Sequence, residues 1–322
     1  MELNEFLAEW HNDNPRILVH TSGSTGKPKP LMVEKKRMIN SARITCDFLG
    51  LKPGDTALLC MPLDYIAGKM MVVRSLQRDL RLTTVRPSSH PLADETLPSF
   101  TFAAMVPMQV YNSLKVPCER ERLMRIRHLI IGGGAISDEL AQMIKPLPNA
   151  VWSTYGMTET LSHIALRRLN GPDASLWYTP FDGVGISLNA DGCLVIDAPE
   201  VCAEPLATND IAQLRTDDRT GKTLFRIKGR KDNVVCSGGI KIQIEEVEET
   251  LRPHLSAPFM IVKKQDEMLG EKAILLTESA DLIHIAEICR NTLPKYWVPR
   301  EFLHIDHLPL TETGKPKRSG AF

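Results

Sequence analysis

The sequence lacks an excess of charge of either sign, and it lacks any long apolar run. Lysine plus arginine and aspartate plus glutamate both number 39 among the 322 residues, so the formal net charge is zero. A neutral chain has no broad field that attracts nucleic acid or an anionic membrane, and we expect neither as a partner. No segment has the apolar length that a membrane-spanning helix needs. Any anionic ligand must therefore be held by local groups.

Paired cysteines are also missing. The seven cysteines are scattered, odd in number and form no Cys-x-x-Cys pair, which argues against a disulfide framework or a zinc knuckle. The first twenty residues lack the basic start and apolar run of a secretory signal. We therefore expect a protein of the reducing cytoplasm.

Short apolar or β-branched segments alternate with helical patterns in the first half of the chain. This alternation is typical of an α/β fold with a mainly parallel sheet. After about residue 175, short strands broken by Gly, Asp and Pro predict a β-rich segment that closes the first domain. The predicted strands are 16–20, 56–60, 82–85, 101–106 and 128–131, and the predicted helices include 34–49 and 137–145.

A polar link at 229–232, with the sequence GRKD, precedes a smaller α+β pattern. A chain of this length exceeds the usual size of one hydrophobic core. We therefore predict a large domain at residues 1–229 and a small domain at residues 230–322. In the small domain, strands are predicted from residue 233 and at 259–263, 272–277 and 301–305, with helices at 244–251 and 282–292.

A loop rich in glycine and hydroxyl groups, TSGSTGKPK, follows the first predicted strand. Glycines let backbone N–H groups approach a polyphosphate, hydroxyls add donors, and lysines offset negative charge. The loop is not a Walker A loop, because Pro28 rather than Ser or Thr follows Lys27. From this segment alone, a flexible linker is the alternative. The candidate phosphate ligands are Thr21, Ser22, Gly23, Ser24, Thr25, Gly26 and Lys27.

This loop resembles the phosphate loop of the adenylate-forming superfamily, which includes acyl- and aryl-CoA synthetases, luciferases and peptide-synthetase adenylation domains. Further blocks follow in the order usual for that superfamily. The resemblance implies an acid-thiol ligase that uses ATP, Mg²⁺ and coenzyme A, and a C-terminal domain that is mobile. The blocks are MPLDYIAG at 61–68, GGGA at 132–135, YGMTET at 155–160, TND at 208–210, GRKD at 229–232, SGG at 237–239 and TGK at 313–315.

The resemblance assigns three catalytic residues. Activating a carboxylate with ATP brings two anions together, so the site needs cations and N–H donors at the α-phosphate. Glu159 is expected to bind Mg²⁺ together with phosphate oxygens, and Thr158 to donate to the α-phosphate. Taken alone, this Thr-Glu pair would indicate a helix cap. Lys315 resembles the superfamily's mobile lysine, which reaches the substrate carboxylate and the α-phosphate.

The nucleotide is expected at the carboxyl end of the sheet. Asp210 is the implied acceptor for the ribose hydroxyls, and Arg230 is the second ribose contact. Asn209 stands where the family usually has glycine, so the local turn is expected to differ. The residues implied around adenine are Gly133, Gly134, Ala135, Tyr155 and Gly156.

The resemblance also implies a hinge and a side for thioester formation. Asp232 resembles the residue about which the small domain turns between the two half-reactions. The loop formed by Ser237, Gly238 and Gly239 would then face the coenzyme A site.

The segment YGMTETLSHIALRRLNG is most similar to the o-succinylbenzoate-CoA ligases of menaquinone synthesis. That acid has two carboxylates, so one must be activated and the other held. Ser162 and His163 are candidates for the distal group, although a buried structural pair is an equal alternative. Tyr65 is expected as an aromatic wall of the acid pocket. Met108 is expected either in that pocket or in ordinary packing.

Alternatives to this ligase remain open at the level of sequence. They are another aryl-CoA ligase, an adenylation enzyme that loads a carrier protein, and an inactive nucleotide-binding protein. Superfamily members usually carry a long stretch before the phosphate loop, whereas here the loop begins at Thr21. The resemblance therefore implies that a front subdomain is missing, and we expect a homodimer to cover the exposed apolar surface.

Overall fold

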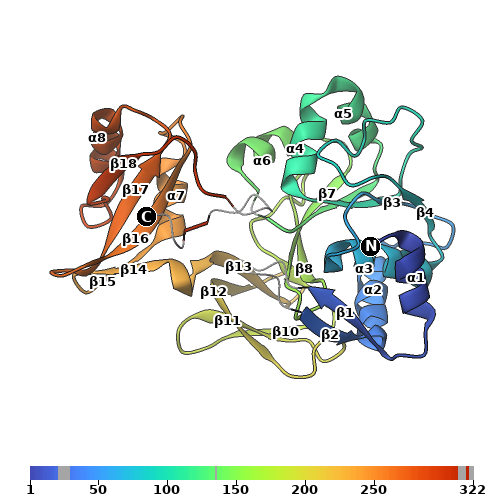
Figure 1. The fold of residues 1–322 in the computed structure, drawn as a ribbon. Helices are drawn as coiled ribbons and strands as arrows, with labels where there is room; N and C mark the ends of the chain where they lie inside the picture. The colour runs from blue at the N-terminus through green and yellow to red at the C-terminus, as the bar shows by residue number, and fades with distance from the viewer. Residues whose placement is uncertain (21–29, 135, 311–316, 319–322) are drawn as a thin grey trace. The chain divides into compact units, whose positions relative to one another are not determined.

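The computed structural model describes residues 1–20, 30–134, 136–310 and 317–318. The chain divides into two compact units (Figure 1). The domain boundary predicted between residues 229 and 230 stays a prediction. Unit 1 contains Met1–Ile186, Ile196–Leu206 and Arg215–Phe225, and unit 2 contains Ser187–Val195, Ala207–Leu214 and Arg226–Phe322.

Unit 1 is built on a seven-stranded sheet with the order β4-β3-β5-β6-β7-β8-β9. The strands from β4 to β7 are parallel, and β8 and β9 add antiparallel pairs. The side chains of β5 are all buried, as in a parallel sheet covered on both faces. The predicted α/β fold class is confirmed. The strands are β3 (Thr56–Leu59), β4 (Arg81–Thr84), β5 (Phe102–Met105), β6 (His128–Ile131), β7 (Ala150–Gly156), β8 (His163–Arg168) and β9 (Thr179–Pro180).

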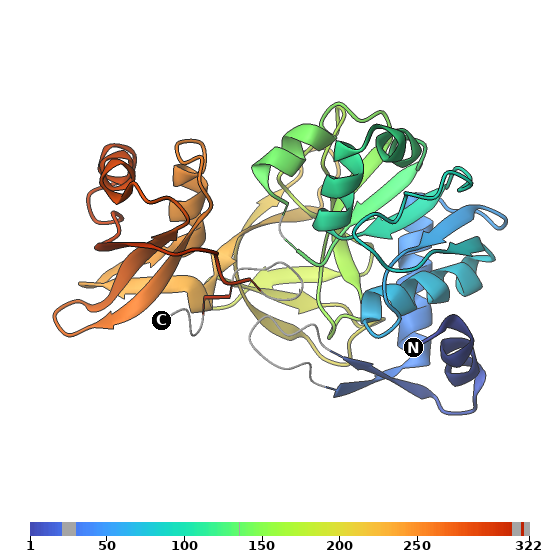
Figure 2. The same cartoon turned by 45° about the horizontal axis from the view of Figure 1, so that its top comes forward.

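The helices of unit 1 have clear start and stop signals. The left-handed Gly50, at φ 64°, ends α2, and the Ser137 hydroxyl accepts from the Leu140 N–H at 3.2 Å at the start of α6. Helices α2 and α3 pack against each other, and they lie side by side in both views (Figures 1 and 2). The helices are α1 (Leu3–His11), α2 (Lys35–Leu49), α3 (Ile66–Arg78), α4 (Pro107–Lys115), α5 (Pro117–Met124) and α6 (Asp138–Ile144).

The first predicted strand does not join the parallel sheet. Strand β1 (Arg16–His20) pairs antiparallel with β2 (Pro30–Glu34) in a separate two-stranded sheet. Residues of β1 alternate between exposed and buried positions, a pattern typical of antiparallel strands with one face on the core. The strand predicted at 16–20 is confirmed, but it does not belong to the mainly parallel sheet with which it was grouped, and β2 was not predicted.

Unit 2 contains a five-stranded sheet in which β15, β14, β17 and β16 follow one another and β18 pairs parallel with β17. Its elements follow the predicted α+β pattern, but two strands, β14 and β15, stand where one was predicted from residue 233, and β16 and β17 are longer than expected. They are η1 (Lys231–Asn233), β14 (Val234–Ser237), β15 (Ile240–Gln243), α7 (Ile244–Leu251), β16 (Phe259–Asp266), β17 (Gly270–Thr277), α8 (Leu282–Thr292) and β18 (Glu301–His304).

A further four-stranded sheet has the order β10-β11-β12-β13, and its residues are divided between the two units. It corresponds to the predicted β-rich segment. Its strands are β10 (Gly185–Leu188), β11 (Cys193–Asp197), β12 (Leu206–Thr216) and β13 (Thr223–Arg230). Across the ranges described here, no helix has the length and apolar character needed to cross a membrane.

Candidate active site

A tight connection between β7 and β8 carries the predicted catalytic pair. A side chain at Gly156 would come within 2.2 Å of the Ser162 carbonyl oxygen, so only glycine fits there. The buried Thr160 hydroxyl accepts from the Met157 N–H at 2.9 Å and donates to the Ser162 carbonyl at 2.7 Å. Leu161 takes a left-handed conformation, with φ 64°. This turn places Thr158 and Glu159 just beyond the carboxyl end of β7.

Glu159 has the properties of a ligand for a metal that arrives with phosphate. Its side chain is exposed, and its main-chain carbonyl accepts from the Cys202 thiol at 3.3 Å. Its carboxylate meets no ion-pair partner in the described part of the chain. Mg²⁺ commonly binds one or two carboxylates and completes its shell with phosphate oxygens and water. Glu159 therefore fits a Mg²⁺ ion that is shared with a nucleotide.

The glycine block lies beside the aromatic residue expected at adenine. Strands β6 and β7 are parallel neighbours. Gly133, just after β6, and Tyr155, near the carboxyl end of β7, therefore lie at the same edge of the sheet, where nucleotides bind in α/β folds. A side chain at Gly132 would lie 2.5 Å from the Thr154 hydroxyl, and Gly133 has φ 80°. The Tyr155 ring packs edge-on against Phe225, with 5.0 Å between centroids. Glycine is thus required at 132 because of close approach and at 133 because of the backbone conformation.

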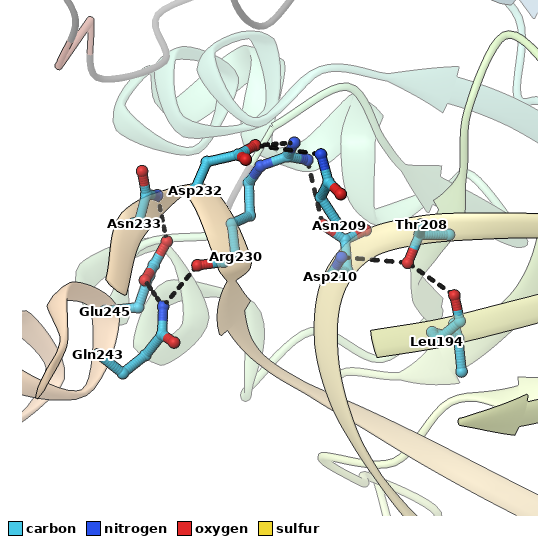
Figure 3. A network of polar contacts seen from close by, with 9 residues as sticks. All are labelled: Leu194, Thr208, Asn209, Asp210, Arg230, Asp232, Asn233, Gln243 and Glu245. Carbon is cyan, nitrogen blue, oxygen red and sulfur yellow. Dashed lines mark hydrogen bonds and ion pairs between the residues drawn. The ribbon is translucent and has the colours of Figure 1, made fainter. Parts of the chain in front are cut away.

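Unit 2 brings the predicted ribose contacts and the predicted hinge residue together (Figure 3). The Arg230 guanidinium pairs with Asp210 at 3.1 Å and with Asp232 at 2.9 Å. The Asn209 amide donates to the same Asp232 carboxylate at 3.3 Å. Asn209 therefore makes a contact that glycine, the usual residue of the family, could not make. The Asp210 N–H donates to the Thr208 hydroxyl at 3.1 Å.

Ser162 and His163, the candidates for the distal acid group, lie in a buried polar cluster of unit 1. His163 is hydrogen-bonded through Nε2 to Thr45 at 3.0 Å and through Nδ1 to Ser162 at 3.2 Å. Burial, and then the positive charge of Arg74, lower the pKa of His163 well below its usual 6.5. The imidazole is therefore neutral at neutral pH and donates through one nitrogen only.

Arg74 belongs to this cluster, and sequence reasoning missed it. Its side chain is only 2% exposed, and it donates to the Ser162 hydroxyl at 2.5 Å. Its Nε has no hydrogen-bond partner, and no carboxylate pairs with it in the described ranges. Burial lowers the pKa of Arg74 to about 10, so the group remains charged at neutral pH. The signal in the sequence was a lone arginine inside the apolar stretch MMVVRSL of α3.

The other predicted site residues fall in three places. Tyr65 is the N-cap of α3 and forms an isolated β-bridge with His20. Met108 is 57% exposed in α4. Gly238 and Gly239, with φ 56° and 81°, form the two-residue turn between β14 and β15, which requires positive φ at both positions. Thr21, Ser22, Gly23, Ser24, Thr25, Gly26, Lys27, Ala135 and Lys315 lie outside the described residues.

Known proteins resemble this chain over almost all of its length. The AMP-binding enzyme family matches residues 4–203. An acyl-CoA synthetase (AMP-forming)/AMP-acid ligase II-like protein from Dyadobacter fermentans has a solved structure that is 34% identical, covers 98% of this chain and 91% of its own, and has a TM-score of 0.68. The curated 2-succinylbenzoate–CoA ligase of Bacillus mycoides is 25% identical over 95% of this chain and 69% of its own length.

A solved Bacillus subtilis o-succinylbenzoate coenzyme A synthetase, in complex with ATP and a magnesium ion, shares the fold. It is 23% identical, covers 94% of this chain and 69% of its own, and has a TM-score of 0.74. The chain belongs to the AMP-binding enzyme family. It is an AMP-forming ligase, as the sequence predicted.

Proposed function

We propose that this enzyme activates a carboxylic acid as its acyl-adenylate and then transfers the acyl group to coenzyme A, and that the acid carries a second carboxylate. The observation that carries the second part is Arg74, a buried cation that meets no carboxylate in the described part of unit 1. A buried charge without a counter-ion is unfavourable. A substrate anion that binds beside Arg74 would remove that penalty, so affinity and specificity would come from one contact.

o-Succinylbenzoate is the first candidate for the acid. It has one carboxylate to activate and another to hold, and several curated relatives are named 2-succinylbenzoate–CoA ligases, at about 25% identity. Ser162 and His163 lie beside Arg74 and hold its position through a chain of hydrogen bonds that continues to Thr45. The guanidinium therefore supports recognition of an anionic group from a fixed position.

The two half-reactions divide the remaining residues. In the first, Glu159 would hold Mg²⁺ on the phosphates, and Thr158 would donate to the α-phosphate that the substrate carboxylate attacks. Asp210 and Arg230 would hold the ribose. In the second, the thiol of coenzyme A would displace AMP from the acyl-adenylate, on the side of the turn at Gly238.

ATP–pyrophosphate exchange tests this proposal when it is measured with a panel of aryl, aliphatic and dicarboxylic acids and followed by mass analysis for a coenzyme A thioester. We expect exchange to be strongest with o-succinylbenzoate and a thioester to form. Exchange without a thioester would favour a carrier-loading enzyme, and exchange with monocarboxylic aryl acids alone would favour another aryl ligase. No exchange with any acid would indicate an inactive nucleotide-binding protein.

Lys315 is tested separately, through the two half-reactions. Lys315→Ala should slow adenylation by about two to three orders of magnitude, the scale for removing one charge-stabilising donor. It should still pass a supplied acyl-adenylate to coenzyme A. The exposed Lys295→Ala is a matched control in unit 2. Normal adenylation by Lys315→Ala would show that the assignment of this lysine is wrong.

A further inference from the structure

The polar link that carries Arg230 rests on the start of helix α7 (Figure 3). We propose that Gln243 is a positioning residue for ATP binding, because it fixes the main chain at Arg230 and thereby directs the guanidinium toward the ribose. This inference rests on the proposed role of Arg230 as a ribose contact. Gln243 itself would not touch the nucleotide.

The contacts of Gln243 are directed at the main chain of the link. Gln243 is only 9% exposed, and its Nε2 donates to the Arg230 carbonyl oxygen at 3.0 Å. The same amide donates to Glu245, whose other carboxylate oxygen accepts from the Asn233 amide at 2.5 Å. The link is therefore held on both sides of the hinge residue by side chains at the start of α7. A buried amide that is held by a second acceptor has little freedom to follow a displaced carbonyl.

Gly229 shows how closely the link lies on Gln243. A side chain at this position would come within 2.4 Å of the Gln243 Nε2 atom and within 2.7 Å of a Glu245 carboxylate oxygen. The φ angle of Gly229 is not in the left-handed region. A side chain here would therefore displace the Gln243 amide from the link, an effect of close approach and not of backbone conformation. The contact with Gln243 gives a physical reason for the glycine that precedes Arg230, and the sequence alone does not reveal it.

The far end of the arginine is held less firmly. The Arg230 side chain is 37% exposed and is shared between Asp210 and Asp232. The pair with Asp232, whose side chain is 50% exposed, contributes little, so this carboxylate does not define one direction for the guanidinium. The carbonyl contact with Gln243 fixes the point from which the side chain extends. Losing this contact should therefore weaken ribose binding more than it slows chemistry.

Steady-state kinetics of Gln243→Met test the inference, because methionine keeps the length of the side chain and removes the donor. We expect the KM for ATP to rise about threefold to tenfold, the range for one hydrogen bond, with kcat changed less than twofold. The exposed Gln265→Met in β16 is the matched control and should leave both constants unchanged. A lower melting temperature with an unchanged KM would overturn the inference, since it would show a merely structural role.

Two further variants separate this inference from the proposed function. Arg230→Ala alone should raise the KM for ATP, and adding Gln243→Met to it should cause little further loss, because both act on one contact. An unchanged KM in Arg230→Ala would reject the ribose role itself. If Arg230→Ala raises the KM for ATP, two results would reject only the positioning role. One is that the effects of Arg230→Ala and Gln243→Met on the KM add fully in the double variant, and the other is that Gln243→Met leaves the KM unchanged.

Gly229→Ala disturbs the same contact through the link instead of through Gln243. This test therefore does not depend on how Gln243→Met folds. The added methyl group should push the link away from Gln243, so the KM for ATP should rise by at least as much as in Gln243→Met. A normal KM in Gly229→Ala would contradict the inference.

Discussion

Arg74 and Arg230 are the two arginines proposed to bind the substrates, Arg74 the acid and Arg230 the ribose of ATP. Their surroundings differ sharply. Arg74 is 2% exposed in α3 of unit 1, and it reaches a serine hydroxyl rather than a carboxylate. Arg230 is 37% exposed in unit 2 and pairs with Asp210 and Asp232. A buried and uncompensated charge is unfavourable until an anion arrives. A partly exposed charge that already has partners is placed for the ligand before binding, but it gains little further stabilisation from it.

The difference indicates two kinds of recognition in one enzyme. The site around Arg74 should discriminate strongly between acids, because a ligand without the second carboxylate leaves the buried charge unpaired. The site around Arg230 should bind its nucleotide through several contacts, each of which has a smaller effect than the contact at Arg74. Four changes, taken from the largest expected effect to the smallest, test this comparison.

Arg74→Met should have the largest effect. We expect kcat/KM for o-succinylbenzoate to fall about a hundredfold or more, the scale for losing one partner of a buried charge pair. The melting temperature should stay equal or rise, because the free enzyme loses an unpaired buried charge. Arg78→Met is the control in the same helix, since Arg78 is a more exposed residue paired with Asp47. A fall in stability without loss of acid discrimination would remove the contrast with Arg230.

Asp210→Asn should raise the KM for ATP about tenfold to a hundredfold, because it removes a charged acceptor from the proposed ribose site and one partner of Arg230. The KM for the acid should not change. Asp191→Asn, which removes an exposed partner of Lys231 in the same unit, is the matched control. Equal effects of these two variants on the KM for ATP would contradict the role of Asp210.

The stability of unit 1 should depend on pH through His163. Its pKa is lowered by burial and by Arg74, so the folded protein keeps it neutral where the unfolded chain already binds a proton. The free energy of unfolding should therefore be fully retained above about pH 6.5. It should fall as the pH drops below that value, by at most about 1.4 kcal/mol per pH unit. Urea unfolding between pH 7.5 and 5.5 should show a shallower slope for His163→Asn, and parallel slopes would contradict this account.

Asn209→Gly should have the smallest effect. It restores the residue usual in the superfamily and removes one exposed hydrogen bond to Asp232. We expect the KM for ATP to change by about twofold or less, since such a bond contributes little. Measured rates of the two half-reactions would show whether the contact holds the hinge. A change of tenfold or more in either rate would contradict the minor role expected for this contact.

Much of the fold could be predicted from the sequence. The strand at 128–131 and the helices at 244–251 and 282–292 were predicted with their observed bounds, because apolar periodicity and turn residues are local signals. Strand β2 and its antiparallel pairing with β1 were not predicted. That pairing joins segments on either side of the phosphate loop, and no local pattern specifies it.

The candidate site divides in the same way. The sequence by itself predicts the ATP side, because that chemistry depends on short blocks such as YGMTET and GRKD, in which spacing along the chain places the groups. Only the tertiary structure led to the proposed acid side and the proposed support of the link. Arg74 and Ser162 are 88 residues apart in the chain, and Gln243 meets the Arg230 carbonyl only after β15 returns to the link. The physical reason is burial, since a charge or an amide acquires its role from the groups that folding places around it.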